Sequence, residues 1–145
     1  MEVVKLENIQ IVDEVSNWEE SVQRSGQLLV DSGFVEPSYI DAIFESTKVN
    51  GPYYVLAPEI AMPHASGDSG VKASQISLLI VKKPFKFSEE GFDVRLVFTL
   101  ASADSESHLG FLRSLSELFS NDEDVQKLIS SETPTEAYEL LQNIK

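Results

Sequence analysis

The spacing of apolar residues differs between the ends and the middle of the chain. Residues 17–31 and a segment that begins at Pro37 place apolar side chains three and four positions apart, which is the helical period. Gly33 stands just past the first segment, where a C-cap is expected, and proline is common at the first position of a helix. Residues 50–52, Asn-Gly-Pro, end the second segment. The sequence therefore predicts two helices in its first third.

The middle of the chain has the composition of β-strands. Residues 76–81 are nearly all apolar, as in a strand covered on both faces, and residues 94–100 are its predicted neighbour. No helical pattern separates these two strands, which disfavours a fully parallel sheet. A further strand is predicted at the start of the chain, with Val4 and Leu6, and then Ile9 and Ile11, as its apolar positions, and another in the β-prone run 53–56.

Three amphipathic helices are predicted to close the chain. The first covers residues 109–119, Asn121 is expected to cap the second, and residues 133–136 form a capping box with proline at the first position of the third. Helices at both ends with strands between them predict an α/β fold with a mixed central β-sheet and helices on both faces. The length of 145 residues suits a single domain over 1–145.

Composition excludes several classes of function. The net charge of −13 opposes binding to nucleic acid or to an anionic membrane, because both require a basic surface. The absence of cysteine excludes disulfides, thiolate metal sites and a cysteine nucleophile. No segment approaches the roughly 20 apolar residues that span a bilayer, and the first ten residues lack the apolar run of a signal peptide. These features predict a cytoplasmic protein without direct membrane insertion.

The first of two histidines, His64, follows a proline and precedes a segment of small residues. A residue before proline is restricted to extended conformations, so Met62 is expected to stay strand-like up to the histidine. This context predicts an imidazole with a rigid base at the mouth of a loop, where Ser66 and loop N–H groups can meet an anion. The alternative from local sequence is a histidine in an ordinary turn.

The second histidine, His108, stands at the start of the helix predicted over 109–119 and shares its inward face with Phe111 and Leu115. A helix start attracts anions through its free N–H groups and its dipole, so His108 is a second candidate for anion contact. The alternative is a partly buried histidine bonded to a carbonyl. The two histidines match no compact zinc pattern, and no P-loop is present, so neither a metal nor a cofactor is expected.

Residues 57–65, with the sequence Ala-Pro-Glu-Ile-Ala-Met-Pro-His-Ala, closely resemble the active-site signature of type 2 enzyme IIA domains of the bacterial phosphotransferase system, the mannitol/fructose-type superfamily. The lead-in at 51–56 is most similar to the ascorbate-specific branch. Residues 107–109 resemble the second histidine segment of the family, and residues 84–87 and 93–97 resemble the two strands between. The likeness covers nearly the whole chain.

The resemblance implies the type 2 enzyme IIA fold and a phosphotransferase component of sugar transport, with a phosphohistidine at His64 and a supporting histidine at His108. It also implies the phosphocarrier protein HPr as phosphoryl donor and the cysteine of a IIB component as acceptor. The alternative is a regulatory IIA-like domain, of the nitrogen or transcription-regulator type, that signals through histidine phosphorylation. The sequence leaves a homodimer open.

Histidine suits a phosphoryl relay because neutral imidazole is a good nucleophile near pH 7 and its phosphoramidate bond keeps a high transfer potential. We expect His108 to donate a hydrogen bond to the phosphoryl oxygens, with Ser66 as a weaker candidate for a further donor. An apolar ring around His64 is expected to pack against the partner protein. Its predicted members are Ile60, Met62 and Phe85.

The chain departs from the family pattern at two positions. Mannitol-like members carry an arginine upstream of the active histidine, near the position of Lys48 here. The role of that arginine is therefore either unfilled or taken by Lys48. Many relatives also have glycine where Glu59 stands.

Overall fold

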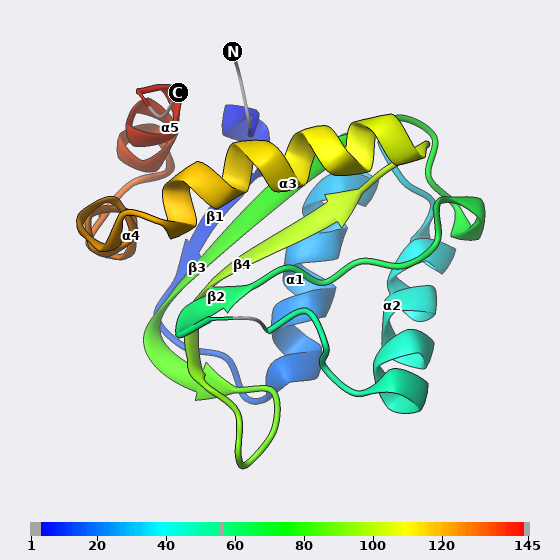
Figure 1. The fold of residues 1–145 in the computed structure, drawn as a ribbon, viewed down its shortest axis with the longest axis horizontal. Helices are drawn as coiled ribbons and strands as arrows, with labels where there is room; N and C mark the ends of the chain where they lie inside the picture. The colour runs from blue at the N-terminus through cyan, green and yellow to red at the C-terminus, as the bar shows by residue number, and fades with distance from the viewer. Residues whose placement is uncertain (1–3, 56, 144–145) are drawn as a thin grey trace.

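The computed structural model describes residues 4–55 and 57–143, and its central sheet lies between two layers of helices (Figure 1). The strands are β1 (Ile9–Val12), β2 (Glu59–Ala61), β3 (Gln75–Lys86) and β4 (Asp93–Ala101). The helices are α1 (Trp18–Asp31), α2 (Pro37–Asn50), α3 (Ser105–Phe119), α4 (Asp122–Ile129) and α5 (Pro134–Gln142), with short 3-10 turns η1 (Leu6–Asn8) and η2 (Gly67–Ser69).

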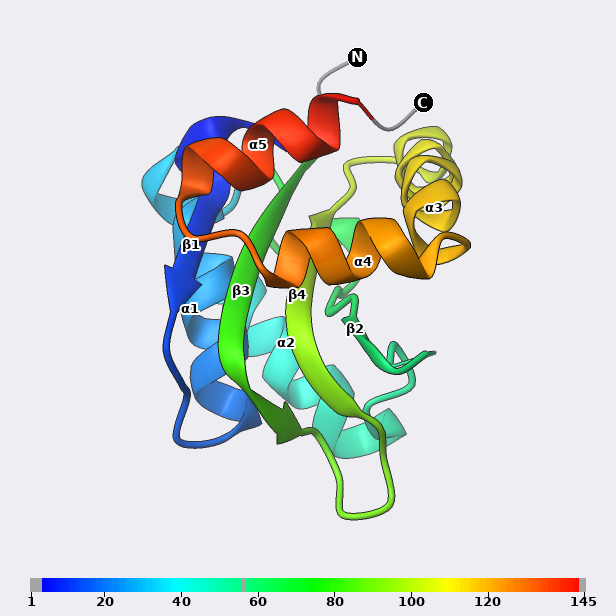
Figure 2. The ribbon, with the colours of Figure 1, turned by 90° about the vertical axis from the view of Figure 1, so that its left-hand side faces the viewer.

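The sheet is mixed and has the strand order β1-β3-β4-β2. β1 is parallel to β3 and β2 is parallel to β4, whereas β3 and β4 are antiparallel. α1 lies against β3 and β4 on one face, while α4 contacts β3 and α5 contacts β1 from the other (Figures 1 and 2). The predicted mixed sheet with helices on both faces is thus confirmed. Within the described residues, no helix is both long and apolar enough to cross a membrane.

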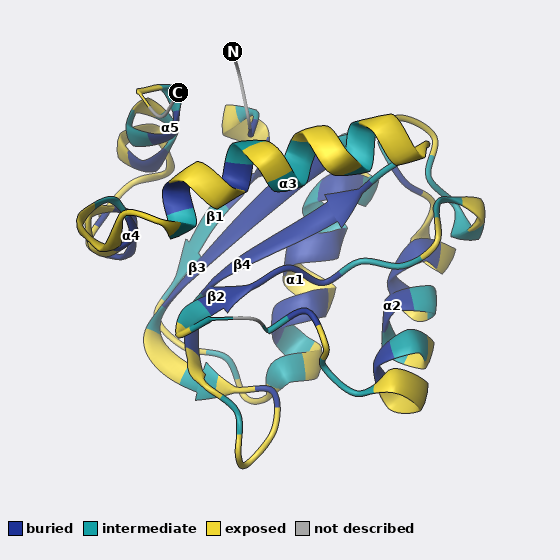
Figure 3. Cartoon of the chain, viewed as in Figure 1, coloured by how far each residue is buried: buried dark blue, intermediate teal, exposed yellow. Residues whose placement is uncertain are grey.

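The core lies between the sheet and its helices (Figure 3). Residues 76–81 of β3 are all buried, as expected of a strand covered on both faces. In β4, burial is continuous from residue 96 to residue 101. The carboxyl end of β4 is therefore held by packing on both sides, which fixes the point from which the chain turns into α3.

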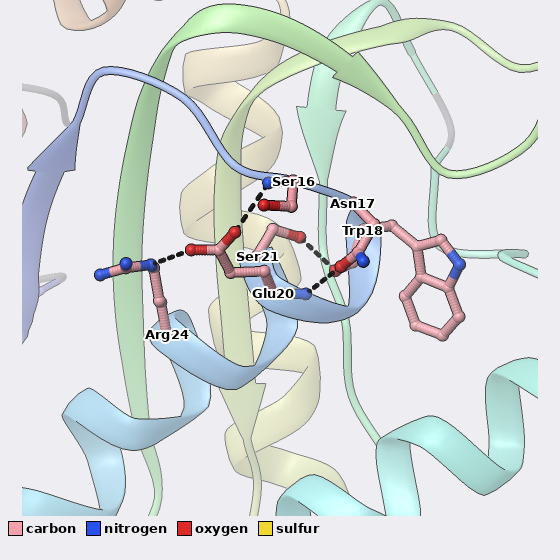
Figure 4. A network of polar contacts seen from close by, with 6 residues as sticks. All are labelled: Ser16, Asn17, Trp18, Glu20, Ser21 and Arg24. Atoms are coloured by element: carbon pink, nitrogen blue, oxygen red, sulfur yellow. Dashed lines mark hydrogen bonds and ion pairs between the residues drawn. The ribbon is translucent and has the colours of Figure 1, made fainter.

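Side-chain hydrogen bonds cap the amino-terminal turn of α1 (Figure 4). The Glu20 N–H donates to the Asn17 side-chain oxygen at 2.9 Å, and the Ser16 N–H donates to the Glu20 carboxylate at 2.7 Å. Two N–H groups that lack a partner within the helix are thereby satisfied. The Ser16 N–H, with a further bond from Arg24, lowers the pKa of Glu20. The helix predicted over 17–31 accordingly begins at Trp18, with Asn17 as its cap.

Similar side-chain contacts begin α3, α4 and α5, whereas α2 has no side-chain cap. α2 begins at the predicted proline, and the predicted caps of α4 and α5 both accept hydrogen bonds from first-turn N–H groups. α3 begins at Ser105, earlier than predicted, because the Asp104 carboxylate accepts a hydrogen bond from the Ser107 N–H at 2.7 Å. His108 therefore lies a full turn inside the helix and not at its first residue.

The strand predicted from Val4 onward is displaced. It begins only at Ile9, because the Asn8 N–H bonds to the Lys5 carbonyl and closes a 3-10 turn before the sheet is reached. Val4 is nevertheless buried, so its apolar character reflects contact with the core and not pairing in the sheet.

The strand predicted over 53–56 is also wrong within the described residues. Residues 53 and 55 donate their N–H groups to the Gly51 and Pro52 carbonyls, so the segment is a turn whose hydrogen bonds are satisfied locally. Leu56 lies outside the described residues. The aromatic side chains that gave this run its β-like composition pack against their surroundings instead, with the rings of Tyr54 and Phe87 5.5 Å apart.

Candidate functional site

A cavity of about 530 Å³ lies where the loop that contains His64 faces the turn between β4 and α3. Its walls are formed by residues 64–68, residues 102–105, Ser46, Tyr53, His108 and Leu109. Both histidines thus line one cavity, although they come from different segments of the chain. The described residues of the cavity carry hydroxyl, carboxylate and imidazole groups.

Backbone contacts hold His64 in place. β2 ends at Ala61, so the strand that was expected to continue to His64 stops before it. Pro63 has no N–H to donate, but its carbonyl accepts a hydrogen bond from the Leu100 N–H at 3.0 Å. The residue before His64 is therefore joined to the carboxyl end of β4, which is buried from residue 96 to residue 101.

The His64 ring is oriented by the backbone two residues earlier. Its Nδ1 lies 2.8 Å from the Met62 carbonyl oxygen, and because a carbonyl only accepts, we assign the proton to Nδ1. Nε2 is then the ring nitrogen with a free lone pair. The Tyr53 ring stands edge-on to the imidazole, with the two centroids 5.4 Å apart. This arrangement gives a rigid imidazole whose free nitrogen can act as a nucleophile.

His108 lies directly beside His64. The centroids of the two rings are 5.2 Å apart, and the ring planes are inclined by 50°. Ser102, at the end of β4, places its hydroxyl oxygen 3.4 Å from Nδ1 of His108. An anion that contacts one imidazole is consequently within reach of the other.

The environment of His64 favours its neutral form. Burial lowers the pKa of His64 below its ordinary value, the hydrogen bond to the Met62 carbonyl opposes this effect, and the charge of His108 adds to the lowering. The imidazole is therefore neutral at pH 7, which is the state that a nitrogen nucleophile requires.

We expect the His64 ring to titrate with a midpoint below the ordinary histidine pKa of about 6.5. Because the pKa is lowered in the folded state, the unfolded chain binds more protons between the two values. The free energy of unfolding should therefore decrease as the pH falls through about 6.5 towards the folded-state pKa. Nitrogen NMR of the ring across this pH range measures the midpoint, and a His64→Gln variant assigns the signal. A midpoint above the ordinary value would contradict the burial described here.

The described residues that line the cavity include neither lysine nor arginine. Lys48, the expected substitute for the arginine of mannitol-like members, is exposed on α2 and lies outside the lining. Asp68 and Asp104 do line the cavity, and the Ser107 N–H lowers the pKa of Asp104, which is therefore charged at pH 7. An anion held here relies on His108, hydroxyls and N–H groups. Nor does the described part of the chain bring together three histidine, cysteine or carboxylate side chains that could hold a metal ion.

Glu59 occupies a backbone conformation that ordinarily favours glycine. Its φ angle is 76°, and the register between β2 and β4 shifts at this residue. Its carboxylate accepts a hydrogen bond from the guanidinium of Arg95, and both side chains are mostly buried. This charge-assisted bond offsets the cost of a left-handed conformation, which is about 1–2 kcal/mol. The ion pair explains how this position accommodates a glutamate, whereas many relatives have glycine there.

The residues expected to contact a partner are only partly placed at the cavity. Ser66 lines it, but the expected apolar ring does not surround it: Ile60 and Met62 are 4% and 5% exposed, and Phe85, which is half-buried, is not part of the lining. The reason is that Ile60 pairs with β4 and Met62 continues into the core, so both side chains point inward. Tyr53 and Leu109, which are 44% and 59% exposed, are the large apolar residues at the cavity wall.

Sequence reasoning missed Tyr53, Ser46 and Ser102 as cavity residues. Ser102 carried a usable signal, because it follows the strand predicted over 94–100 and precedes a helix start. Tyr53 was hidden by its β-prone neighbours, which predicted a strand where the chain turns. Nothing in the sequence marks Ser46 as a cavity residue, because a single serine on a helix is most often solvated.

Comparisons with known proteins identify relatives over almost the full chain. The family model described as "Phosphoenolpyruvate-dependent sugar phosphotransferase system, EIIA 2" matches residues 2–144. The mannitol-specific cryptic phosphotransferase enzyme IIA component of Escherichia coli (strain K12) is 31% identical over 134 residues, which cover 92% of this chain and 91% of the relative. The ascorbate-specific PTS system EIIA component of Shigella boydii serotype 4 (strain Sb227) is 34% identical over 137 residues, which cover 92% of this chain and 88% of the relative.

A solved structure extends the likeness to three dimensions. In the complex of the mannitol enzyme IIA with the phosphorylated mannitol enzyme IIB from Escherichia coli, the matching chain has a TM-score of 0.84 at 27% sequence identity. The match covers 96% of this chain and 96% of that one.

Proposed function

The chain belongs to the EIIA 2 family of the phosphoenolpyruvate-dependent sugar phosphotransferase system, and we propose that it is a cytoplasmic phosphoryl carrier that is loaded by HPr on His64 and unloaded by a IIB cysteine during sugar uptake. One observation carries the proposal. The Nδ1 atom of the His64 ring is hydrogen-bonded to the backbone, which leaves Nε2 free, and the ring centroids of His64 and His108 are 5.2 Å apart in a shared cavity.

The proposed loading step is an in-line displacement at phosphorus. The lone pair of His64 Nε2 forms the new P–N bond while the bond between phosphorus and the donor protein breaks, and the donor keeps that electron pair. Nδ1 retains its proton and its bond to the Met62 carbonyl throughout, so the ring does not need to rotate. In the unloading step the IIB thiolate attacks the same phosphorus, and Nε2 leaves with its lone pair.

Phosphoryl transfer has a loose transition state, so the protein acts mainly by positioning groups and stabilising charge. We assign the stabilising role to His108, whose Nε2–H donates to a phosphoryl oxygen while the Ser102 hydroxyl holds Nδ1. Ser66 and the loop N–H groups are further donors at the cavity wall. The two cavity carboxylates, Asp68 and Asp104, repel the phosphoryl group, and this repulsion favours its departure to the acceptor.

The partner is expected to dock over the exposed apolar residues of the cavity wall. A Leu109→Asp substitution should slow transfer from HPr about tenfold or more, because it places a charge in the centre of the contact and tenfold corresponds to about 1.4 kcal/mol. Leu109 is 59% exposed, so the fold should be unaffected. The rate of labelling as a function of HPr concentration measures the effect.

Phe92→Asp is the matched control for this docking test. Phe92 is 46% exposed, but it precedes the first residue of β4, whereas the cavity lies beyond the last. This variant should be labelled at the wild-type rate. Equal rates for the two variants would rule out docking over Leu109.

A reconstituted relay tests the proposed function directly. The protein is incubated with radioactive phosphoenolpyruvate, enzyme I and HPr, and a IIB component is then added. We expect label to appear on the protein and to move to IIB. The mannitol complex supports a IIB acceptor, since the matching chain is bound there to phosphorylated enzyme IIB. Label that remains on the protein with every IIB offered would favour a regulatory role, and absence of label would refute the carrier role.

For the sugar, we propose the ascorbate branch. The support is the lead-in at 51–56 together with 34% identity to the ascorbate-specific relative. Parallel reactions with the IIB components of an ascorbate and a mannitol system compare the two acceptors. Faster transfer to the mannitol IIB would overturn the choice of sugar and leave the carrier role intact.

A further inference from the structure

A tyrosine outside the cavity joins the two segments that carry the histidines. Tyr39 belongs to α2 and is 0% exposed, and its hydroxyl accepts a hydrogen bond from the Ala65 N–H at 3.0 Å. The same hydroxyl donates to the Leu100 carbonyl at 2.6 Å. It also lies 3.3 Å from the Ala65 carbonyl, but its one proton serves the nearer acceptor. Ala65 directly follows His64, and Leu100 lies near the end of β4.

Leu100 therefore anchors the chain on both sides of His64. Its N–H donates to the Pro63 carbonyl at 3.0 Å, and its carbonyl is linked through the tyrosine hydroxyl to the Ala65 N–H. Beyond Leu100 the same strand leads within a few residues into α3, which carries His108. These contacts consequently set the position of one imidazole relative to the other.

We propose that Tyr39 is a positioning residue for phosphoryl transfer, because its hydroxyl holds the His64 loop against the end of β4. The inference rests on the proposed function, since it concerns the same transfer. Burial raises the pKa of Tyr39 to about 12, so the hydroxyl stays protonated at physiological pH and can donate and accept at once. Without it, the Leu100 carbonyl, in a residue that is 0% exposed, loses its partner and the loop loses its anchor.

The test compares Tyr39→Phe with Tyr54→Phe. Tyr54 is 2% exposed, burial also raises its pKa to about 12, and its hydroxyl bonds to Thr47 at 2.7 Å and not to the loop. Each variant removes one buried hydroxyl, but only Tyr39→Phe releases Ala65. We expect Tyr39→Phe to lower the transfer rate at saturating HPr by about 10- to 100-fold, with an unchanged apparent KM, because small displacements of reacting groups have effects of this size. Tyr54→Phe should transfer at nearly the wild-type rate.

A second measurement tests, without any phosphoryl transfer, whether the Tyr39 hydroxyl holds the His64 loop. Ala65 lies outside helices and strands, yet its amide should exchange slowly in the wild-type protein because the tyrosine hydroxyl protects it. Exchange should become fast in Tyr39→Phe and stay slow in Tyr54→Phe. Fast exchange in the wild type, or equal transfer rates in the two variants, would overturn the inference. Failure of the wild type to accept label from HPr would instead refute the carrier role. The exchange of the Ala65 amide would still decide whether the Tyr39 hydroxyl holds the loop.

Discussion

Replacing His64 with glutamine should abolish labelling by phosphoenolpyruvate in the presence of enzyme I and HPr. Glutamine has a similar size but no nucleophilic nitrogen, so the P–N bond cannot form. We expect a complete loss and not a partial one, because in the proposed relay the carried group is covalently attached to this residue. The measurement is the radioactivity that co-migrates with the protein after prolonged incubation.

The nearest substitute nucleophile is His108, whose ring lies 5.2 Å from that of His64. The acid stability of any residual label separates the possibilities, since phosphohistidine is acid-labile and phosphoserine is not. Acid-labile label in His64→Gln at the wild-type level would contradict the assignment and move it to His108. Acid-stable label would indicate a serine of the cavity, such as Ser66 or Ser102. A cooperative thermal transition in the variant shows that the loss of label is not a loss of fold.

The fold was predictable where a few neighbouring residues determine the local structure. Asn17, Pro37 and Thr133 begin helices because each satisfies or avoids unpaired N–H groups at a helix start, and such contacts depend on a few neighbouring residues. The run 76–81 is apolar throughout because β3 is covered on both faces. Local signals failed at residues 53–55, whose aromatic side chains suit a strand although the segment is a turn, with Tyr54 packed in the core and Tyr53 exposed at the cavity wall.

The sequence singled out the two histidines that line the cavity, but it did not indicate most of the residues around them. His64 was identified by the proline before it and by the family signature, and His108 by its place at a helix start. Their separation of 5.2 Å depends on how β4 leads into α3, which no local pattern encodes. The choice of Ile60 and Met62 for partner contact failed because a three-residue strand and the residue after it do not reveal from their sequence which side chains enter the core.

Because the described cavity residues include neither lysine nor arginine, the proposed mechanism assigns charge stabilisation to His108. Replacing His108 with glutamine should therefore slow onward transfer to IIB by about 10²- to 10³-fold, the size of effect seen when one donor to a developing charge is removed. The protein should still become labelled after prolonged incubation, since a lost transition-state contact changes rates and not the end point.

A single-turnover experiment separates these two effects of His108→Gln. The labelled variant is isolated, IIB is added, and the loss of label is followed in time beside the wild type. Ser102→Ala is the graded control, because it keeps the imidazole and removes only the hydroxyl 3.4 Å from Nδ1, so its effect should be smaller. If His108→Gln released its label at the wild-type rate, the charge on the phosphoryl group would have to be stabilised by Ser66 and the loop N–H groups alone. The second imidazole would then have no part in the relay, whatever its distance from the first.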